Sequence, residues 1–297
     1  MKGAGAADWL NAVFANNMPK LVGRSCLTPL IGVRGGIAGD FTVTKLSDDE
    51  FMIIGGGMSE RYHSRFWKMV PLPEGTTFES RTDAMCGFNV AGPKSRELLT
   101  RLTNADLSTA AFPFMRSQQI EVAGVPVVAL RVSFTGDLGW ELHCEQADQL
   151  KLYEALLDAG KAVGAGPVGS RALMSLRVEK GYGSWSREYS PEYWPQEVSL
   201  AGLIKLEKEF LHKDAYLRIK DNAPREVMSL IHVTEVTTAD ATGGEPIFLT
   251  DGTPVGRVSS GTYGYGVEMS LALGYLKGVA AGTEVDVMIL GKPHRGV

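Results

Sequence analysis

The sequence lacks features that mark several classes of protein. Its 297 residues carry 30 basic and 34 acidic side chains, a formal net charge of -4, so it has no basic excess for binding nucleic acid. No apolar run approaches the roughly 20 residues that cross a bilayer. The first residues, MKGAGAADWL, lack the apolar stretch of a secretory signal. We therefore expect no nucleic-acid partner and no membrane partner.

Cysteine and histidine are also scarce. The three cysteines, Cys26, Cys86 and Cys144, lie far apart in the sequence, which is typical of a reduced, cytoplasmic protein. The five histidines form no HxxxH or HExxH pair, which argues against a dedicated metal site. A surface or hydrogen-bonded role is the simpler interpretation for each of them.

The length and the apolar fraction of 44% favour a globular chain of two domains. A polar stretch with a proline and no hydrophobic periodicity, RIKDNAPRE, interrupts the pattern after residue 217. We therefore predict a first domain at 1–216, a linker at 217–226 and a second domain at 227–297.

Two pairs of strands are predicted in the first domain. Residues 41–45 (FTVTK) and 51–54 (FMII) are β-branched and apolar, with turn-forming residues between them. Residues 118–123 and 125–133 form the second pair, with Gly124 at the corner.

Two helices are predicted from apolar residues that recur every three to four positions, at 149–163 and at 168–180. Gly181 stands where a glycine commonly ends a helix. The apolar face of the first helix consists of Leu150, Tyr153, Leu156, Leu157 and Val163, and that of the second includes Ala172, Leu173 and Leu176.

Beyond residue 227 the pattern predicts strands alone. They are expected at 227–234, 246–249, 255–259 and 284–290, with a turn at Asp251-Gly252. Such a series is typical of a small antiparallel barrel or sandwich. With the mixed elements before it, the chain is predicted to be an α+β protein.

A glycine-rich turn, Gly35-Gly36-Ile37-Ala38-Gly39-Asp40, precedes the strand that begins at Phe41. Glycines let the backbone turn tightly and approach a ligand, and the turn delivers the Asp40 carboxylate at the start of the strand. An aspartate that only caps the turn would give the same pattern. The motif alone leaves both interpretations open.

Two further motifs combine acids with aromatic residues. The run from Ser133 to Leu142 contains Phe134, Trp140 and Glu141, and such a combination suits a flat heterocycle, although a hairpin with a buried aromatic explains it equally. The other run, at 175–182, carries Arg177, Glu179 and Lys180 at a helix end, where a solvated charged face is the alternative.

Taken together and in this order, the motifs resemble the glycine-cleavage T-protein family, and most closely the folate-binding part of dimethylglycine and sarcosine dehydrogenases. The resemblance runs from about Gly5 to the last residue. It implies an aminomethyltransferase folate-binding fold with a C-terminal antiparallel β-barrel domain. Further landmarks are Val22-Gly23-Arg24, Gly92-Pro93, Glu197, Lys205 to Phe210, Gly256 to Gly261, Tyr263-Gly264-Tyr265 and Ser270 to Leu273.

The resemblance implies tetrahydrofolate as the cofactor. It implies that Asp40 is catalytic and lies near the folate nitrogens that carry the one-carbon unit. A carboxylate there can accept the displaced proton and favour positive charge. The cofactor-binding residues that it implies are Asp40, Gly55, Gly56, Phe134, Glu141, Glu179 and Trp185.

The implied reaction is methylene transfer from an amine-derived iminium to tetrahydrofolate. The alternatives are a demethylase that moves a methyl group directly to folate and a non-catalytic folate-binding protein, although Lys180-Gly181-Tyr182 lacks the cysteine of the latter. The partners expected are a small amine or iminium donor and a flavin-dependent oxidoreductase domain or subunit, because no dinucleotide fingerprint follows a strand here.

The sequence departs from the family pattern at three places. Leu27 replaces an aromatic residue thirteen positions before the essential aspartate. The chain starts inside the family pattern at Gly5, and the residues from Gly291 to His294 are expected to fall short of the closing strand.

Overall fold

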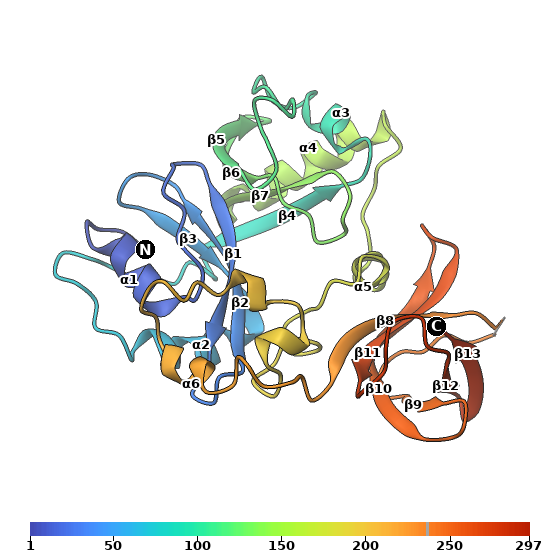
Figure 1. Cartoon of the computed structure of the whole chain (residues 1–297). Coiled ribbons are helices and arrows are strands. Elements are labelled where there is room, and N and C mark those ends of the chain that lie inside the picture. Colours follow the sequence, from blue (N-terminus) through green and yellow to red (C-terminus); the bar gives the residue numbers. More distant parts are fainter. Residues whose placement is uncertain (236–237) are drawn as a thin grey trace. The chain divides into compact units, whose positions relative to one another are not determined.

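The computed structural model describes residues 1–235 and 238–297, which form two compact units (Figure 1). Unit 1 comprises Met1–Thr28, Phe41–Val168 and Glu207–Phe210. Unit 2 comprises Pro29–Asp40, Gly169–Leu206 and Leu211–Val297. Each unit therefore joins segments that are distant in the sequence. The predicted boundary at 217–226 stays a prediction.

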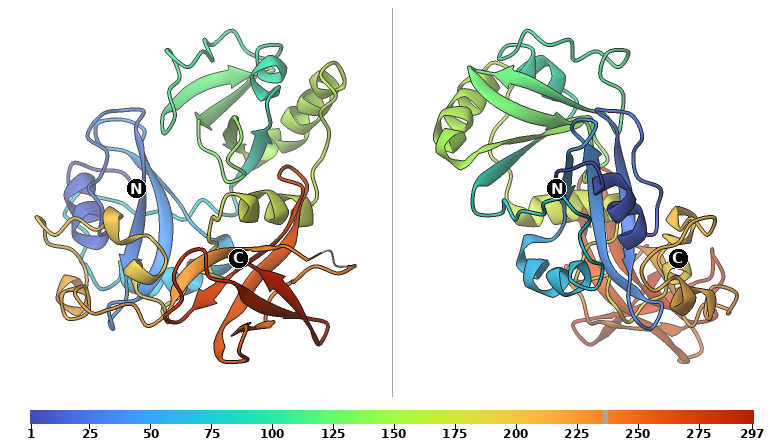
Figure 2. Two further views of the ribbon diagram at one scale, coloured as in Figure 1. Left: turned by 45° about the vertical axis from the view of Figure 1, so that its right-hand side comes forward. Right: turned by 90° about the vertical axis from the view of Figure 1, so that its left-hand side faces the viewer.

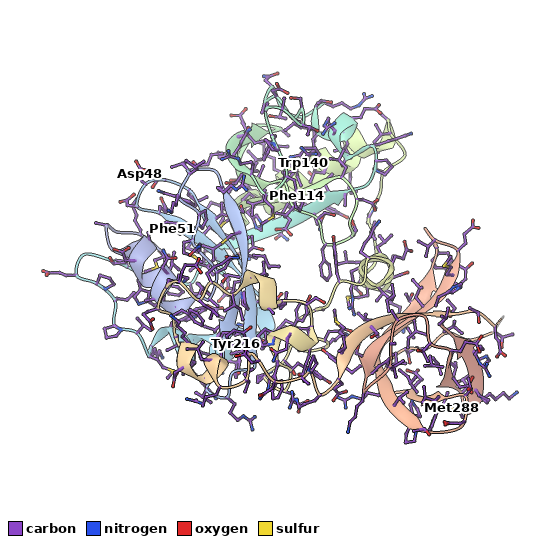
Figure 3. The ribbon with its side chains drawn as sticks, in the orientation of Figure 1. Asp48, Phe51, Phe114, Trp140, Tyr216 and Met288 are labelled. Atoms are coloured by element: carbon purple, nitrogen blue, oxygen red, sulfur yellow. The ribbon has the colours of Figure 1, made fainter. Side chains whose placement is uncertain are left out.

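The largest sheet of unit 1 has four antiparallel strands in the order β4-β7-β6-β5. Its strands are β4 (Met85–Ala91), β5 (Ser117–Val122), β6 (Val125–Leu130) and β7 (Gly139–Glu145). Two helices, α3 (Ser95–Leu99) and α4 (Gln149–Lys161), contribute Leu98 and Leu152 to a common core with Trp140 of β7. Figure 2 shows α4 beside this sheet, and Figure 3 labels Trp140, which is fully buried.

A three-stranded sheet has the order β1-β2-β3. Its strands are β1 (Ser25–Ile31), β2 (Ile37–Lys45) and β3 (Phe51–Ile54). The division between the units falls within β1 and β2. Unit 1 also contains α1 (Ala6–Val13) and α2 (Glu60–Trp67). Rings from these elements pack together, as where Phe41 of β2 and Trp67 of α2 lie 5.3 Å apart between centroids.

Unit 2 contains a closed barrel of six strands in the order β10-β11-β8-β13-β12-β9. Its strands are β8 (Val227–Val233), β9 (Pro246–Leu249), β10 (Pro254–Gly264), β11 (Met269–Leu276), β12 (Val285–Ile289) and β13 (Lys292–Gly296). Two helices also belong to this unit, α5 (Ser170–Glu179) and α6 (Lys213–Leu217). Val178 of α5 packs against Leu271 and Leu273 of β11.

The part of the chain that the structure describes also contains four single-turn 3₁₀ helices: Gly57–Ser59, Gln146–Asp148, Pro195–Glu197 and Ala201–Leu203. Within residues 1–235 and 238–297, no helix has both the length and the apolar character needed to cross a membrane.

Most of the predicted elements are confirmed, with shifted bounds. The strand predicted to begin at Phe41 begins at Ile37, so Asp40 lies within β2, and β10 extends to Gly264 instead of residue 259. The pair at 41–45 and 51–54 is the antiparallel pair β2 and β3. In the second pair, Ala123 leaves the strand with a φ of 53° and forms the turn with Gly124, and β6 ends at Leu130 instead of residue 133. Gly181 has a φ of 65° just past α5, as expected of a glycine that ends a helix.

The predicted apolar face of α4 is wrong in part. Leu150 and Tyr153 are 65% and 39% exposed, whereas Leu152 and Leu156 are buried. Residues four apart lie on one helix face, so Leu152, Leu156 and Gly160 form the buried line and leave the other two residues outside it.

Two strands of the barrel escaped prediction. The β11 segment is a continuous apolar run, so it lacks the alternation that marks a half-buried strand. The expectation that the chain falls short of a closing strand is wrong. Lys292–Gly296 pairs with β12 along its length and with β8 through Gly296 and Val233. Its sequence, KPHRG, has no β-branched residue that would have indicated a strand.

Candidate functional site

The turn before Asp40 requires glycine at two of its positions. Gly35 has a φ of 84°, in the region that L side chains avoid. A Cβ on Gly36 would lie 2.3 Å from the carbonyl oxygen of Pro191, so a side chain there is excluded. The amide of Ile37 then donates to the carbonyl of Tyr193, which fixes the start of β2. The backbone thus places Asp40 on a rigid strand.

The Asp40 carboxyl is held in a setting that disfavours its charge. Burial raises the pKa of Asp40 to about 6, although its own backbone N–H opposes the shift. Among the residues that the structure describes, no basic side chain forms an ion pair with it. The pKa of the Tyr189 phenol is raised to about 12, first by burial and then by the charge of Asp40. The two groups are therefore electrostatic neighbours.

Glu179 lies at the last position of α5 and is half-buried. The backbone N–H of Gly266, in the loop between β10 and β11, donates to Oε1 of Glu179 at 3.0 Å. This contact joins residues 87 positions apart, and nothing in the sequence indicated it.

The interpretation of Arg177 as part of a solvated face is wrong. Its side chain is fully buried and forms an ion pair with Glu188, with 2.8 Å between Nη1 and Oε2. Arg177 also donates to the carbonyl of Tyr182 and to the hydroxyl of Ser260. Helical periodicity does not reveal such a partner, because Glu188 lies outside the helix. Lys180 is exposed, as a charged helix face predicts.

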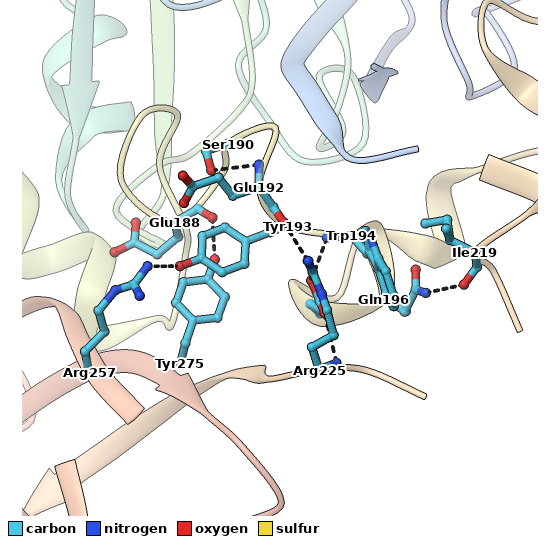
Figure 4. Close-up of polar contacts among 11 residues, drawn as sticks. Glu188, Ser190, Glu192, Tyr193, Trp194, Gln196, Ile219, Arg225, Arg257 and Tyr275 are labelled. Carbon is cyan, nitrogen blue, oxygen red and sulfur yellow. Dashed lines mark hydrogen bonds and ion pairs between the residues drawn. The ribbon is translucent and has the colours of Figure 1, made fainter. Parts of the chain in front are cut away.

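Trp185 lies between α5 and Glu188 in the sequence. It is half-buried and packs against the apolar cluster that contains Ile37, Tyr193 and Tyr275. Figure 4 shows the neighbouring contacts of this cluster, in which the rings of Tyr193 and Tyr275 stack 3.7 Å apart. The hydroxyl of Tyr275 donates to the carbonyl of Glu188. Asp40, Glu179 and Trp185 therefore all belong to unit 2.

The other four predicted site residues belong to unit 1. Glu141 lies on β7 opposite Asn89, and its Oε2 is 3.2 Å from Nε2 of His143. Gly55 and Gly56 directly follow β3 and are exposed, and a Cβ on Gly55 would lie 2.5 Å from the ring of Phe41. Phe134 is half-buried in the segment between β6 and β7. Membership of all seven residues in one site stays a prediction.

Comparison with known families covers nearly the whole chain. Residues 1–208 match the model of the GCVT N-terminal domain. Residues 229–297 match that of the glycine cleavage T-protein C-terminal barrel domain.

The chain is also similar to individual relatives. It is 35% identical to mouse dimethylglycine dehydrogenase over 301 residues, which cover 99% of this chain and 34% of that protein. It is 28% identical to the aminomethyltransferase of Natranaerobius thermophilus, covering 98% of this chain and 80% of the relative. The chain thus spans about a third of the length of the dehydrogenase.

A solved structure shows the same fold. The crystal structure of the glycine cleavage system aminomethyltransferase T from Bartonella henselae superposes with a TM-score of 0.87. The match has 22% sequence identity and covers 99% of this chain and 80% of that one. The predicted α+β fold with a C-terminal barrel is therefore confirmed.

Proposed function

Because the chain belongs to the glycine-cleavage T-protein family, we propose that it transfers a methylene group from an amine-derived iminium to tetrahydrofolate. The observation that carries this proposal is Asp40, a half-buried carboxylate whose pKa desolvation raises to about 6, on the strand that follows the glycine turn. Perturbed acids of this kind are typical of catalytic sites.

The side chains of unit 2 suit a reduced pterin. Its amino and ring N–H groups are hydrogen-bond donors that need acceptors once they are removed from water. Glu179 offers a carboxylate that is already oriented by the Gly266 amide. Asp40 offers a second carboxylate without a basic partner among the described residues. Unit 2 thus offers two carboxylates that can accept from these donors.

The proposal assigns Asp40 the role of the proton acceptor. When bound, tetrahydrofolate supplies the nitrogen to which the one-carbon unit becomes attached. With a pKa of about 6, the Asp40 carboxylate is mostly ionised at neutral pH, so its Oδ atoms can accept a proton. Tyr189, with its pKa raised to about 12, stays protonated beside it. The proposed cofactor-binding set is Asp40, Gly55, Gly56, Phe134, Glu141, Glu179 and Trp185.

The proposal extends to the donor and the setting. The relation to a dimethylglycine dehydrogenase supports a methylated amine as the source of carbon and a flavin-dependent domain or subunit as the partner that oxidises it. The proposed location is cytoplasmic, and it rests on the scarcity of cysteine in the sequence.

One experiment tests the reaction. The protein is incubated with tetrahydrofolate and dimethylglycine, with and without a flavin-dependent amine oxidase, and the folate product is identified by mass spectrometry. We expect methylene-tetrahydrofolate at a rate above that without the protein, and only when the oxidase is present. Methyl-tetrahydrofolate formed without an oxidant would instead establish direct demethylation and overturn the proposal.

The role of Asp40 is tested in the same assay. We expect kcat/KM to rise with pH through about 6, because only the ionised carboxylate accepts a proton. Asp40→Asn should lower kcat by about a hundredfold or more and weaken folate binding by a smaller factor. Turnover of this variant at the parent rate would show that the assignment is wrong.

A further inference from the structure

Two glycines lie against the side chain of Glu179: Gly264, the last residue of β10, and Gly266, in the loop between β10 and β11. The Gly266 amide donates to Oε1 of Glu179 at 3.0 Å. A Cβ on Gly266 would lie 2.6 Å from Oε2, and a Cβ on Gly264 would lie 2.9 Å from Cγ of the same side chain. The space that a side chain at 266 would fill is therefore taken by Glu179, which also takes part of the space at 264.

We propose that Gly266 is a positioning residue for Glu179: its amide and its bare Cα fix the carboxylate in the orientation that binds tetrahydrofolate. The inference rests on the proposed function. A glutamate at a helix end has several rotamers, and holding one of them before binding removes an entropic cost of recognition. An amide N–H that bonds a carboxylate forms a strong, charge-assisted hydrogen bond. This hydrogen bond occupies one lone pair of the Glu179 carboxylate and leaves the other lone pairs free to accept from a ligand.

Of Gly264 and Gly266, Gly266 is the better position for a test by substitution. A Cβ on Gly264 would also meet Val267 and Leu271, so alanine there disturbs the packing of the hairpin. The nearest atoms to a Cβ on Gly266 all belong to the Glu179 carboxylate, which is the flexible end of a side chain. Gly266 does not have a positive φ, so its backbone suits alanine. Gly266→Ala should therefore displace the carboxylate and leave the loop in place.

The test measures the dissociation constant of tetrahydrofolate by anaerobic titration calorimetry on the full chain. The variants are Gly266→Ala, Glu179→Ala and the double variant. Gly202→Ala is the matched control, because Gly202 lies in the same unit, has open space around it and has no positive φ. We expect Gly266→Ala to weaken tetrahydrofolate binding about tenfold, because the displaced Glu179 carboxylate then loses a hydrogen bond from the ligand. The control should bind as the parent does.

The double variant separates positioning from a merely structural role. If Gly266 acts through Glu179, Gly266→Ala adds no loss once Glu179 is alanine, because the new methyl group then meets no carboxylate. In turnover, Gly266→Ala should raise KM for tetrahydrofolate and leave kcat within about twofold of the parent, as for lost uniform binding.

Two results overturn the inference: parent affinity in Gly266→Ala, or losses that add in the double variant. A parent chain that does not bind tetrahydrofolate overturns the proposed function instead, and the inference with it. If the parent binds tetrahydrofolate and Gly266→Ala binds it with the same affinity, the inference alone is wrong and the proposed function is unaffected.

Discussion

Asp40 is a residue whose burial costs the protein stability. Its carboxyl is partly shielded from water, and no basic side chain among the described residues forms an ion pair with it. Unfolding exposes the group to water, where its pKa returns to about 3.9. A residue that weakens the fold yet lies within a strand is more readily explained by function than by structure.

The cost of Asp40 can be measured as a dependence of stability on pH. Because the pKa of about 6 in the folded state exceeds the unfolded value, the folded state binds more protons between pH 4 and pH 6. The free energy of unfolding therefore falls as pH rises through this window. Asp40→Asn does not titrate, so we expect it to exceed the parent by about 2 kcal/mol at pH 8 and to match it near pH 4.

Urea unfolding at the two pH values checks this expectation. Asp83→Asn is the control, because the same change at an exposed position should alter the free energy of unfolding by less than about 0.5 kcal/mol at either pH. An Asp40→Asn variant that is no more stable than the parent at pH 8 would mean that Asp40 is solvated.

The sequence indicated the setting of Asp40 but not its neighbours. The glycines that turn the backbone and the strand that follows are local signals, and both are present in the structure. Tyr189, Glu188 and Gly266 are joined to the predicted residues by contacts that cross many residues of sequence. Such contacts leave no periodic pattern in a single sequence, so neither the buried ion pair of Arg177 nor the contact with Glu179 could be predicted.

At the scale of elements, the Arg177–Glu188 pair fastens α5 and the following loop to the barrel. Glu188 accepts from the amide of Ser184 and from the hydroxyl groups of Ser259 and Ser260 on β10. The pair therefore joins three elements of unit 2 through one carboxylate. Removing the arginine leaves this charge buried without its cation.

We expect Arg177→Ala to lower the free energy of unfolding by about 3 to 5 kcal/mol, the usual loss when one partner of a buried ion pair is removed. Arg218→Ala removes an exposed pair with Asp214, whose side chains are 63% and 78% accessible, and should cost less than about 1 kcal/mol. Urea unfolding of the two variants under one condition makes the comparison. A loss below about 1 kcal/mol for Arg177→Ala would contradict the structural role of the pair.

Elements whose apolar residues recur with the period of a strand or a helix could be predicted from the sequence. Strands that form only because neighbouring strands pair with their backbone could not. The strands at 41–45 and 51–54 carry their own β-branched pattern. The final strand, Lys292–Gly296, has no such pattern and is a strand because β12 and β8 pair with its backbone. Backbone hydrogen bonds form whatever the side-chain type, so the hydrophobicity pattern does not predict a polar strand of this kind.

At the scale of the whole molecule, the barrel shares its unit with segments far from it in sequence. The ring of Tyr275 on β11 stacks on Tyr193, and Ser260 on β10 binds Arg177. The predicted linker also takes part. Arg225 pairs with the fully buried Glu197 and lies over the ring of Trp194 at 4.2 Å (Figure 4). Residues 169–206 thus depend on the part of the chain that follows them.

A chain that ends after Leu217 should therefore lose the fold of residues 169–206, although a cut at the predicted linker would normally release an intact domain. Without the barrel, Val178 and Tyr193 lose their apolar partners, and the Arg177–Glu188 pair loses the hydroxyl groups that satisfy it. The β4 to β7 sheet keeps its own core and should stay folded. Amide hydrogen exchange read by mass spectrometry compares the two chains. We expect peptides from 169–206 to lose protection in the short chain while those from 117–145 keep it, and protection of both regions would show that the first domain folds without the barrel.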